Sequence, residues 1–181
     1  MLKPLNDNIF ILRDPVDTTH RGVEISEKAL TKNYVGVIKA IESDKNVTFG
    51  VGDRVHLPHY QVSEWLVDGV EYAVVKGSDL FAKLEDETYR PVNGYVRVRK
   101  CENDHVRDSS GKVALYMTEN HIENTNWVEV IDVADDCKHI RKEWVGYFCI
   151  APESSDKLQR ILYSKDYMLH ESAIEFLTDG E

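Results

Sequence analysis

The chain has 181 residues, 42% of them hydrophobic, and its 22 Lys and Arg against 32 Asp and Glu give a net charge of −10. This composition predicts a folded acidic protein with one ordinary domain or two small ones, and it excludes a chain that is disordered throughout. The acidic balance argues against nucleic acid or an anionic membrane surface as the main partner, because both attract concentrated positive charge.

The cysteines and the first residues indicate a reducing compartment. Cys101, Cys137 and Cys149 form an odd set at irregular spacing, which cannot make a closed disulfide framework. The first residues contain no apolar run typical of a secretory signal, and no later segment approaches the roughly 20 apolar residues of a membrane span. We therefore expect a cytoplasmic protein.

Alternating apolar residues predict β-strands in the first half of the chain. The alternation runs through residues 8–13, 35–41 and 71–76. Residues 80–84 are too few to distinguish a helical turn from a strand, and the acidic residues 85–89 are expected to form a short joint. The aromatic side chains Tyr60, Trp65 and Tyr72 are expected in the core. The fold class predicted from these patterns is all-β.

The second half of the chain repeats the first in the same order. Arg90-Pro91-Val92-Asn93 corresponds to Lys3-Pro4-Leu5-Asn6 at an offset of 90 − 3 = 87 residues. Three further blocks repeat at offsets of 93 or 94 residues, namely 35–38 as 128–131, 51–58 as 145–152 and 78–84 as 171–177. Four blocks in one order predict two tandem copies of one small β unit, residues 1–86 and residues 87–181.

Each predicted unit contains a long polar loop with an apolar tip. The loops are residues 14–33 and 101–126, and each lies between the first and second strand blocks of its unit. The candidate binding residues at the tips are Gly22, Val23, Glu24 and Ile25 in the first loop and Gly111, Val113, Ala114 and Leu115 in the second. A glycine followed by alternating apolar residues is by itself more often a short buried strand. Because it lies in a polar loop in both halves of the chain, a binding loop is favoured here.

These motifs together resemble the GroES-type co-chaperonin (chaperonin-10) family. Family members open with a Pro-Leu-x-Asp segment and an alternating strand, as in residues 4–13, and carry a Gly-Asp pair before a strand, as in residues 49–55. They end in a Ser-Asp-Ile-Leu-Ala-like strand, as in residues 78–82. Two positions depart from the pattern, because Gly146-Tyr147 replaces the Gly-Asp pair and Glu24 replaces an apolar residue. The resemblance spans nearly the whole chain, twice, and implies two tandem GroES-like small β-barrels.

The resemblance also implies a function. A co-chaperonin caps an ATP-driven GroEL-type chaperonin ring through mobile loops and assists protein folding in the closed chamber. It has no active site and no cofactor of its own, because the partner chaperonin binds the ATP. In the family's rings the first strand of one subunit pairs with the last strand of its neighbour. Two units in one chain therefore imply a homo-oligomeric ring of three or four chains. A bacterial or a viral version of the family is equally compatible, so the expected cytoplasm includes that of an infected bacterial host.

Metal binding, enzyme catalysis and a structural role are the competing functions. His56 with His59, and the run 135–139, bring metal-ligand types together, but neither has a second half at zinc spacing. Cys149 lies in an apolar strand, where a thiol is usually inert, and no dinucleotide-binding turn is present. We therefore expect neither a metal site nor an enzyme. The alternative is a non-catalytic structural or assembly module, viral or cellular, that kept the GroES-like fold without chaperonin binding.

Overall fold

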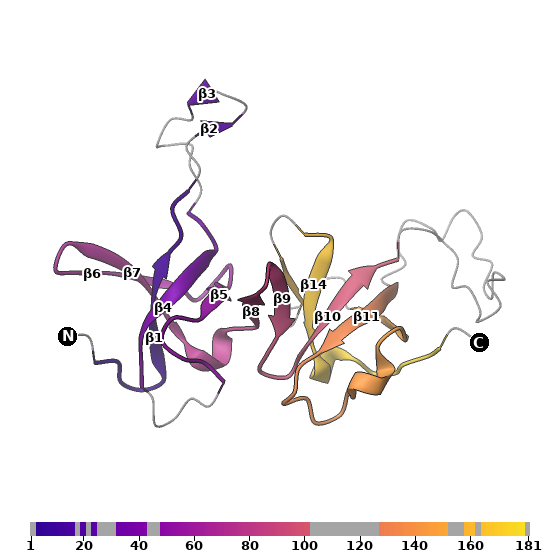
Figure 1. Ribbon diagram of the computed structural model, residues 1–181. Coiled ribbons are helices and arrows are strands. Elements are labelled where there is room, and N and C mark those ends of the chain that lie inside the picture. Colours follow the sequence, from indigo (N-terminus) through magenta and orange to yellow (C-terminus); the bar gives the residue numbers. More distant parts are fainter. Residues whose placement is uncertain are drawn as a thin grey trace. The chain divides into compact units, whose positions relative to one another are not determined.

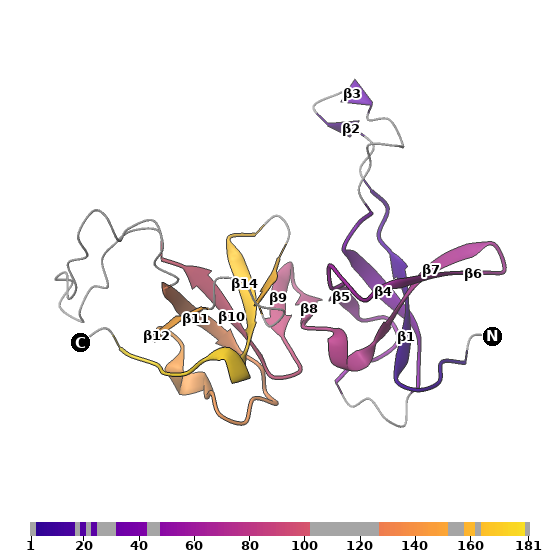
Figure 2. The same cartoon turned by 180° about the vertical axis from the view of Figure 1, so that it is seen from behind.

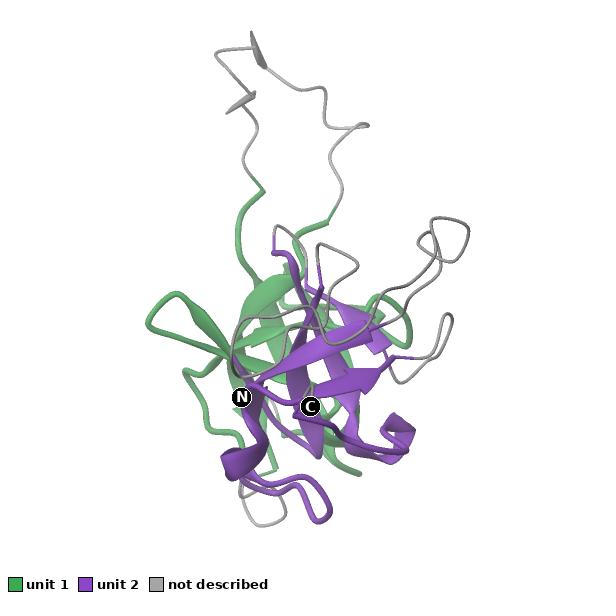
Figure 3. Cartoon of the chain, turned by 90° about the vertical axis from the view of Figure 1, so that its right-hand side faces the viewer, with its two compact units in different colours: residues 1–89 green, residues 90–181 purple. Residues whose placement is uncertain are grey.

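The structure is a computed structural model that describes residues 3–16, 19–20, 23–24, 32–42, 48–101, 127–151, 158–161 and 164–179. Every regular element in these ranges is a β-strand or a short 3₁₀ turn, so the all-β prediction is confirmed. No helix in the described ranges has the length and apolar character that a membrane crossing requires. The chain divides into two compact units, Met1–Tyr89 and Arg90–Glu181 (Figure 3). The assignment of residues 1–86 and 87–181 to two barrels of one family stays a prediction.

The first unit is built on a seven-stranded sheet with the order β6-β7-β1-β4-β5-β8-β9 (Figure 1). Among the described pairings this order has two ends, β6 and β9, so the predicted barrel is not seen to close. A separate two-stranded sheet joins β2 to β3. The elements are β1 (Asn8–Arg13), β2 (Thr19–His20), β3 (Val23–Glu24), β4 (Val35–Ile41), β5 (Arg54–His56), β6 (Ser63–Val67), β7 (Val70–Lys76), η2 (Gly77–Asp79), β8 (Ala82–Glu85) and β9 (Thr88–Pro91).

The core of the first unit covers both faces of β1. Ile9 and Ile11 are fully buried on one face, whereas Phe10 packs with Ala40 and Val74 on the other. A strand that is covered on both sides has consecutive apolar residues in addition to the alternating pattern. The expectation of an aromatic core was wrong for two of three residues, because Tyr60 is 81% and Trp65 is 56% exposed.

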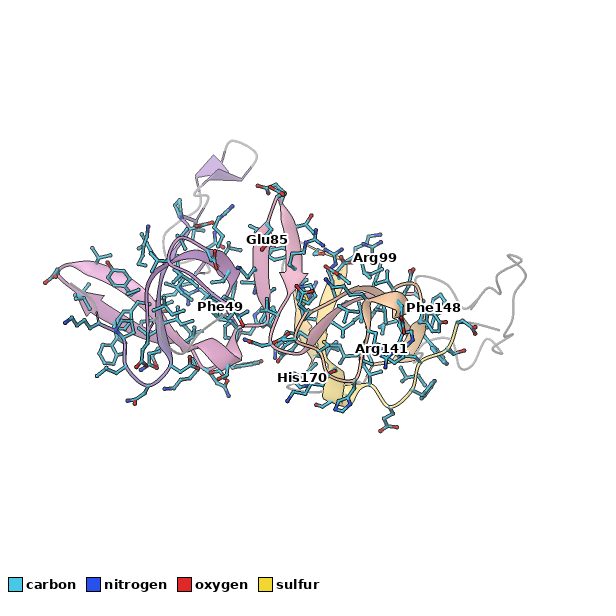
Figure 4. The ribbon with its side chains drawn as sticks, turned by 60° about the horizontal axis from the view of Figure 1, so that its bottom comes forward. Phe49, Glu85, Arg99, Arg141, Phe148 and His170 are labelled. Carbon is cyan, nitrogen blue, oxygen red and sulfur yellow. The ribbon has the colours of Figure 1, made fainter. Side chains whose placement is uncertain are left out.

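Two tight hairpins connect neighbouring strands of this sheet. Asp68 and Gly69 join β6 to β7, and Asp86 and Glu87 join β8 to β9, with positive φ at all four residues. Positive φ at both central residues is the geometry of a type I′ turn, whose twist matches that of the flanking strands. The acidic stretch predicted to be a joint is therefore a hairpin, with Glu85 at the end of β8 (Figure 4).

A glycine in β4 allows the sheet to pack closely around β1. A Cβ atom at Gly36 would lie 2.6 Å from both the side chain of Ile11 and the backbone oxygen of Leu12. Real Cβ atoms do not approach other atoms so closely, and the oxygen belongs to the paired strand, which cannot move alone. Gly36 therefore sets the separation of β1 and β4.

A buried histidine occupies the other side of β4. His56 is fully buried on β5, and its Nδ1–H donates to the backbone oxygen of Leu57 at 2.8 Å. Its ring lies 5.1 Å from the ring of Phe81 and 5.5 Å from that of Tyr89. Burial among these groups lowers the pKa of His56 to about 4, because the charged form loses its hydration.

The second unit has a five-stranded sheet with the order β12-β11-β10-β14-β13 (Figure 2). Its core consists of buried aliphatic residues of the central strands, such as Val96, Val98, Val130 and Leu169. Phe148 on β12 also forms an isolated antiparallel bridge with Thr178 (Figure 4). The elements are β10 (Tyr95–Lys100), β11 (Trp127–Val133), η4 (Lys142–Trp144), β12 (Phe148–Ile150), β13 (Leu158–Arg160), β14 (Asp166–His170) and η5 (Glu171–Ala173).

The strand order of the second unit repeats that of the first. The second sheet, taken from β13 to β12, has the order β13-β14-β10-β11-β12, and the first five strands of the other sheet have the order β6-β7-β1-β4-β5. Strands at the same place in these two orders also have the same place along the chain among the strands of these two lists. Both first strands carry a bulge, between Phe10 and Ile11 in β1 and between Arg97 and Val98 in β10. The two bulges are 97 − 10 = 87 residues apart, which is the offset of the repeated N-terminal block.

The turns that precede the two first strands also correspond. Asn6 and Asp7 have φ of 58° and 61°, and Asn93 and Gly94 have φ of 55° and 73°. The amide of Asn8 donates to the carbonyl of Leu5, and the amide of Tyr95, 87 residues later, donates to that of Val92. Bulge and turn thus place equivalent positions of the two units in the same backbone geometry.

One interaction distinguishes the second unit from the first. The buried carboxylate of Glu171 accepts backbone N–H groups from Lys138 at 2.9 Å, His139 at 2.8 Å and Ile140 at 3.3 Å. Burial alone would raise the pKa of Glu171, but these hydrogen bonds favour the ionised form and leave the pKa lowered. The 3₁₀ turns η2 and η5 correspond at an offset of 171 − 77 = 94 residues, one more than the sequence repeat predicted for this block. The equivalent position in the first unit is therefore Gly77, which has no side chain to do this.

Substitution of Gly36 by Ala is expected to destabilise the first unit by about 2–3 kcal/mol, because the added methyl group overpacks the β1–β4 pair. Urea unfolding measures the effect. Gly50→Ala is the matched control, since its Cβ would meet only Asp53 Oδ2, at 3.9 Å. Equal stability of the two variants would contradict the close approach.

Acidification is expected to destabilise the first unit through His56. The folded-state pKa of about 4 lies below the ordinary 6.5, so the unfolded chain takes up the proton first. The stability that the neutral ring contributes is therefore fully present above pH 6.5 and is lost as the pH falls from 6.5 to 4. Between pH 7 and 5 the free energy of unfolding should fall by about 2 kcal/mol more in the wild type than in His56→Gln. NMR titration of the ring gives the pKa directly, and a value near 6.5 would refute the prediction.

Candidate functional site

The first predicted binding loop lies between β1 and β4. Val23 and Glu24 form β3, which pairs with β2 so that His20 is opposite Val23 and Thr19 is opposite Glu24. Gly22 and Ile25 lie outside the described residues. The extended backbone is compatible with a binding strand, and the binding role of the four residues stays a prediction.

The second predicted loop lies between β10 and β11. Its candidate residues lie outside the described residues: Gly111, Val113, Ala114 and Leu115. The described flanks are Cys101 and Trp127, and the Cys101 amide donates to the backbone oxygen of Trp127 at 3.2 Å. The two ends of this loop therefore leave the sheet as neighbours.

Backbone hydrogen bonds hold the ends of the first loop together. The amide of Asp14 donates to the backbone oxygen of Val35 at 2.8 Å. The side chain of Asn33 accepts the amide of Val35 at 3.0 Å and donates to the backbone oxygen of Pro15 at 3.4 Å. Asn33 thus connects both ends of the loop, as Asn side chains commonly do beside turns.

Charged side chains surround the same ends. Arg13 Nη2 lies 2.9 Å from Glu64 Oε1, and Lys32 Nζ lies 3.3 Å from the same oxygen and 2.7 Å from Glu71 Oε1. The hydrogen bond between Lys32 and Glu71 raises the pKa of the lysine and lowers that of the carboxyl. We call Arg13, Lys32, Glu64 and Glu71 the root cluster of the first loop.

A further ion pair joins the first loop to β5. Arg54 donates to Asp14 Oδ2, and this hydrogen bond raises the pKa of the guanidinium. Arg54, Glu64 and Glu71 were not singled out from the sequence. They are 64 − 32 = 32 to 51 residues from their partners, and isolated surface charges carry no periodic signal that could have identified them.

The ends of the second loop are surrounded by different chemistry. Lys100 Nζ lies 5.6 Å from the centre of the Tyr167 ring, a cation–π distance. Trp127 packs edge-to-face with Phe176, with ring centres 5.8 Å apart. These aromatic contacts lie beside an ion pair, because Arg99, two residues before Cys101, donates to Asp166 Oδ1 at 2.7 Å and to Oδ2 at 3.3 Å.

Metal-binding groups and reactive cysteines are the other candidates for a functional site. The described residues contain no group of three or more His, Cys, Asp and Glu side chains placed to hold a metal ion. Burial is the main cause that raises the pKa of Cys101, and that raises the pKa of Cys137 and Cys149 to about 12. A nucleophilic thiolate is therefore disfavoured at all three positions near neutral pH.

Comparison with known proteins identifies relatives of the first unit. The family model described as "Chaperonin 10 Kd subunit" matches residues 1–84. The chain is 34% identical over 86 residues to "Co-chaperonin GroES" of Treponema denticola, which covers 46% of this chain and 98% of that protein. It is 33% identical over 93 residues to "Co-chaperonin GroES" of Syntrophotalea carbinolica, with shares of 46% and 98%. For the protein of that name from Paracidovorax citrulli the identity is 34% over 93 residues, with shares of 46% and 97%.

The matched residues and the described fold agree. Residues 1–84 contain the bulged first strand, the polar loop and the root cluster, and they end within β8. The relatives are covered almost completely at more than 30% identity, so the likeness extends over their whole fold. The chain therefore belongs to the chaperonin 10 family.

Proposed function

We propose that this protein is a co-chaperonin that caps a GroEL-type chaperonin ring and helps proteins to fold in the closed chamber. The observation that carries the proposal is the polar loop with the short strand β3, inserted between the bulged strand β1 and β4 of a family member. The loop tips, Gly22 to Ile25 and Gly111 with Val113 to Leu115, would bind apolar grooves of the chaperonin. ATP would be bound by the chaperonin, and the protein would act without a cofactor, in the cytoplasm.

The energetics favour several weak loops over one strong loop. Burying a side chain such as Val23 or Ile25 contributes about 1.5–3 kcal/mol. Ordering a loop on binding costs about 2–5 kcal/mol, which offsets much of this gain. Several loops on one rigid assembly increase the overall affinity by roughly 10²- to 10⁴-fold, because the later contacts become intramolecular. Each contact remains weak enough to be released when the chaperonin changes state.

We further propose that the second unit is a second copy of the first. The strand order recurs, and the bulge and the preceding turn recur at an offset of 87 residues. The loop that contains Val113 and Leu115 follows β10 as the first loop follows β1. One chain would then supply two loops. Glu24 in the first tip would face water or a basic group of the chaperonin, since an unpaired buried carboxylate would cost several kcal/mol.

Exposed residues at the two ends of the chain favour a head-to-tail ring. Leu5 is 66% exposed, whereas its equivalent Val92, beside β9, is 8% exposed. Phe176 is 47% exposed, whereas its equivalent Ala82, on β8, is fully buried. Because β8 pairs with β9 within the chain, the end of one chain would pair with the start of the next. Three or four chains would give six or eight units, which mismatches a sevenfold chaperonin.

Charged substitutions in the loop tips are expected to abolish nucleotide-dependent co-sedimentation with a GroEL-type chaperonin. Val23→Asp/Ile25→Asp tests the first loop and Val113→Asp/Leu115→Asp the second, because carboxylates lose the apolar contact. Val51→Asp/Leu66→Asp is the matched control, since both residues are exposed and outside the loops. A wild type that binds no chaperonin would favour the alternative of a structural or assembly module.

Leu5→Asp and Phe176→Asp are each expected to reduce the assembly from a ring to single chains, because each places a charge in the proposed head-to-tail contact. Light scattering after size exclusion measures the mass. Leu66→Asp, at a residue that is 75% exposed, should leave the ring intact. Rings of unchanged mass in both end variants would refute the proposed contact.

A further inference from the structure

The root cluster connects the two ends of the first loop through a single carboxylate. Arg13 is the last residue of β1, and Lys32 lies three residues before β4. Both cations reach the same oxygen, Oε1 of Glu64, at 2.9 Å and 3.3 Å. Arg13 Nη1 also donates to the backbone oxygen of Asn33, so its guanidinium bridges Glu64 and the second end of the loop.

The carboxylate is held by a hairpin that is itself fixed to β1. Glu64 lies on β6 opposite Ala73 of β7, and β7 pairs with β1 along four residues. Trp65 packs edge-to-face on Phe10 of β1, with ring centres 6.1 Å apart. The position of Glu64 is therefore set by the sheet, and the loop ends adapt to it.

Partial burial makes this carboxylate more effective than an ordinary surface charge. The side chain of Glu64 is 29% exposed and that of Arg13 is 17% exposed. Fully exposed ion pairs contribute little, since water screens them and two long side chains lose freedom. Glu71, 57% exposed, adds a second partner for Lys32 at the water-facing side of the cluster.

Holding the loop ends affects how strongly the loop can bind. A loop whose ends are fixed has fewer residues to order when its tip enters a groove, and each ordered residue has an entropic cost. In the second unit the position equivalent to Arg13 is 13 + 87 = 100, and Lys100 lies over the Tyr167 ring. The bridge by Glu64 between the two ends of a loop is thus described for the first loop, whereas an ion pair of Arg99 with Asp166 lies beside the second.

We propose that Glu64 is a positioning residue for the first loop: it bridges Arg13 and Lys32 and so raises the affinity of the loop tip for the chaperonin groove. The inference rests on the proposed co-chaperonin function and adds a residue that does not touch the partner. Glu71 supports it by holding Lys32.

Glu64→Gln tests the proposal, because glutamine keeps the shape and removes the charge. Titration of a GroEL-type chaperonin with ATP present should show binding about tenfold weaker than for the wild type. Glu143→Gln, which removes one partner of the exposed pair between Arg141 and Glu143 in the other unit, is the matched control and should bind as the wild type does. Equal affinity of Glu64→Gln and the wild type would overturn the proposal.

A double-mutant cycle with Lys32→Gln tests whether the bridge acts as a unit. If it does, Glu64→Gln/Lys32→Gln should bind no more weakly than either single variant, whereas a purely additive loss would overturn the bridge. Hydrogen exchange of the free protein gives a readout without the chaperonin. The Asp14 amide, which donates to Val35, should exchange about tenfold faster in Glu64→Gln and at the wild-type rate in Glu143→Gln.

These readouts separate the two proposals. A wild type that fails to bind the chaperonin refutes the proposed function, and the exchange rates then decide the bridge alone. A wild type that binds, together with unchanged exchange and affinity in Glu64→Gln, refutes the bridge and leaves the function standing.

Discussion

The bulged antiparallel pairing of β1 with β4 is the constraint on which the first unit depends. β1 lies between β4 and β7, and its apolar residues are covered on both faces. The close approach at Gly36 brings the two strands together where the polar loop leaves and rejoins the sheet. The loop ends, the ion pairs around them and the hairpin that carries Glu64 are all positioned by this one pair of strands.

The same constraint recurs in the second unit with different side chains. β10 and β11 repeat the bulge, and the loop between them begins and ends at neighbouring residues. The groups around that point include the aromatic contacts of Lys100 with Tyr167 and of Trp127 with Phe176, and the ion pair of Arg99 with Asp166. Backbone geometry is thus preserved while the side chains around the loop differ.

Sequence patterns predicted the central strands well and the edge of the sheet poorly. Residues 8–13 and 35–41 were predicted as strands and are β1 and β4, because a half-buried or buried strand must carry a regular apolar pattern. β6 was not predicted, since its side chains are exposed and nothing constrains their order. For the same reason Tyr60 and Trp65 were wrongly expected in the core. The root cluster could not be predicted, because its members meet only after the sheet has formed.

The hydrogen bonds to Glu171 have a consequence for how this chain tolerates sequence change. Three backbone N–H groups, from Lys138 to Ile140, share one carboxylate, and every residue except proline supplies such a group whatever side chain it carries. Lys138 and His139 are exposed, so their side chains contribute little to the packing of the fold. Position 171 has no such freedom, because only a carboxylate can satisfy all three donors. Saturation substitution should therefore find many folded variants at 138 and 139 and few at 171.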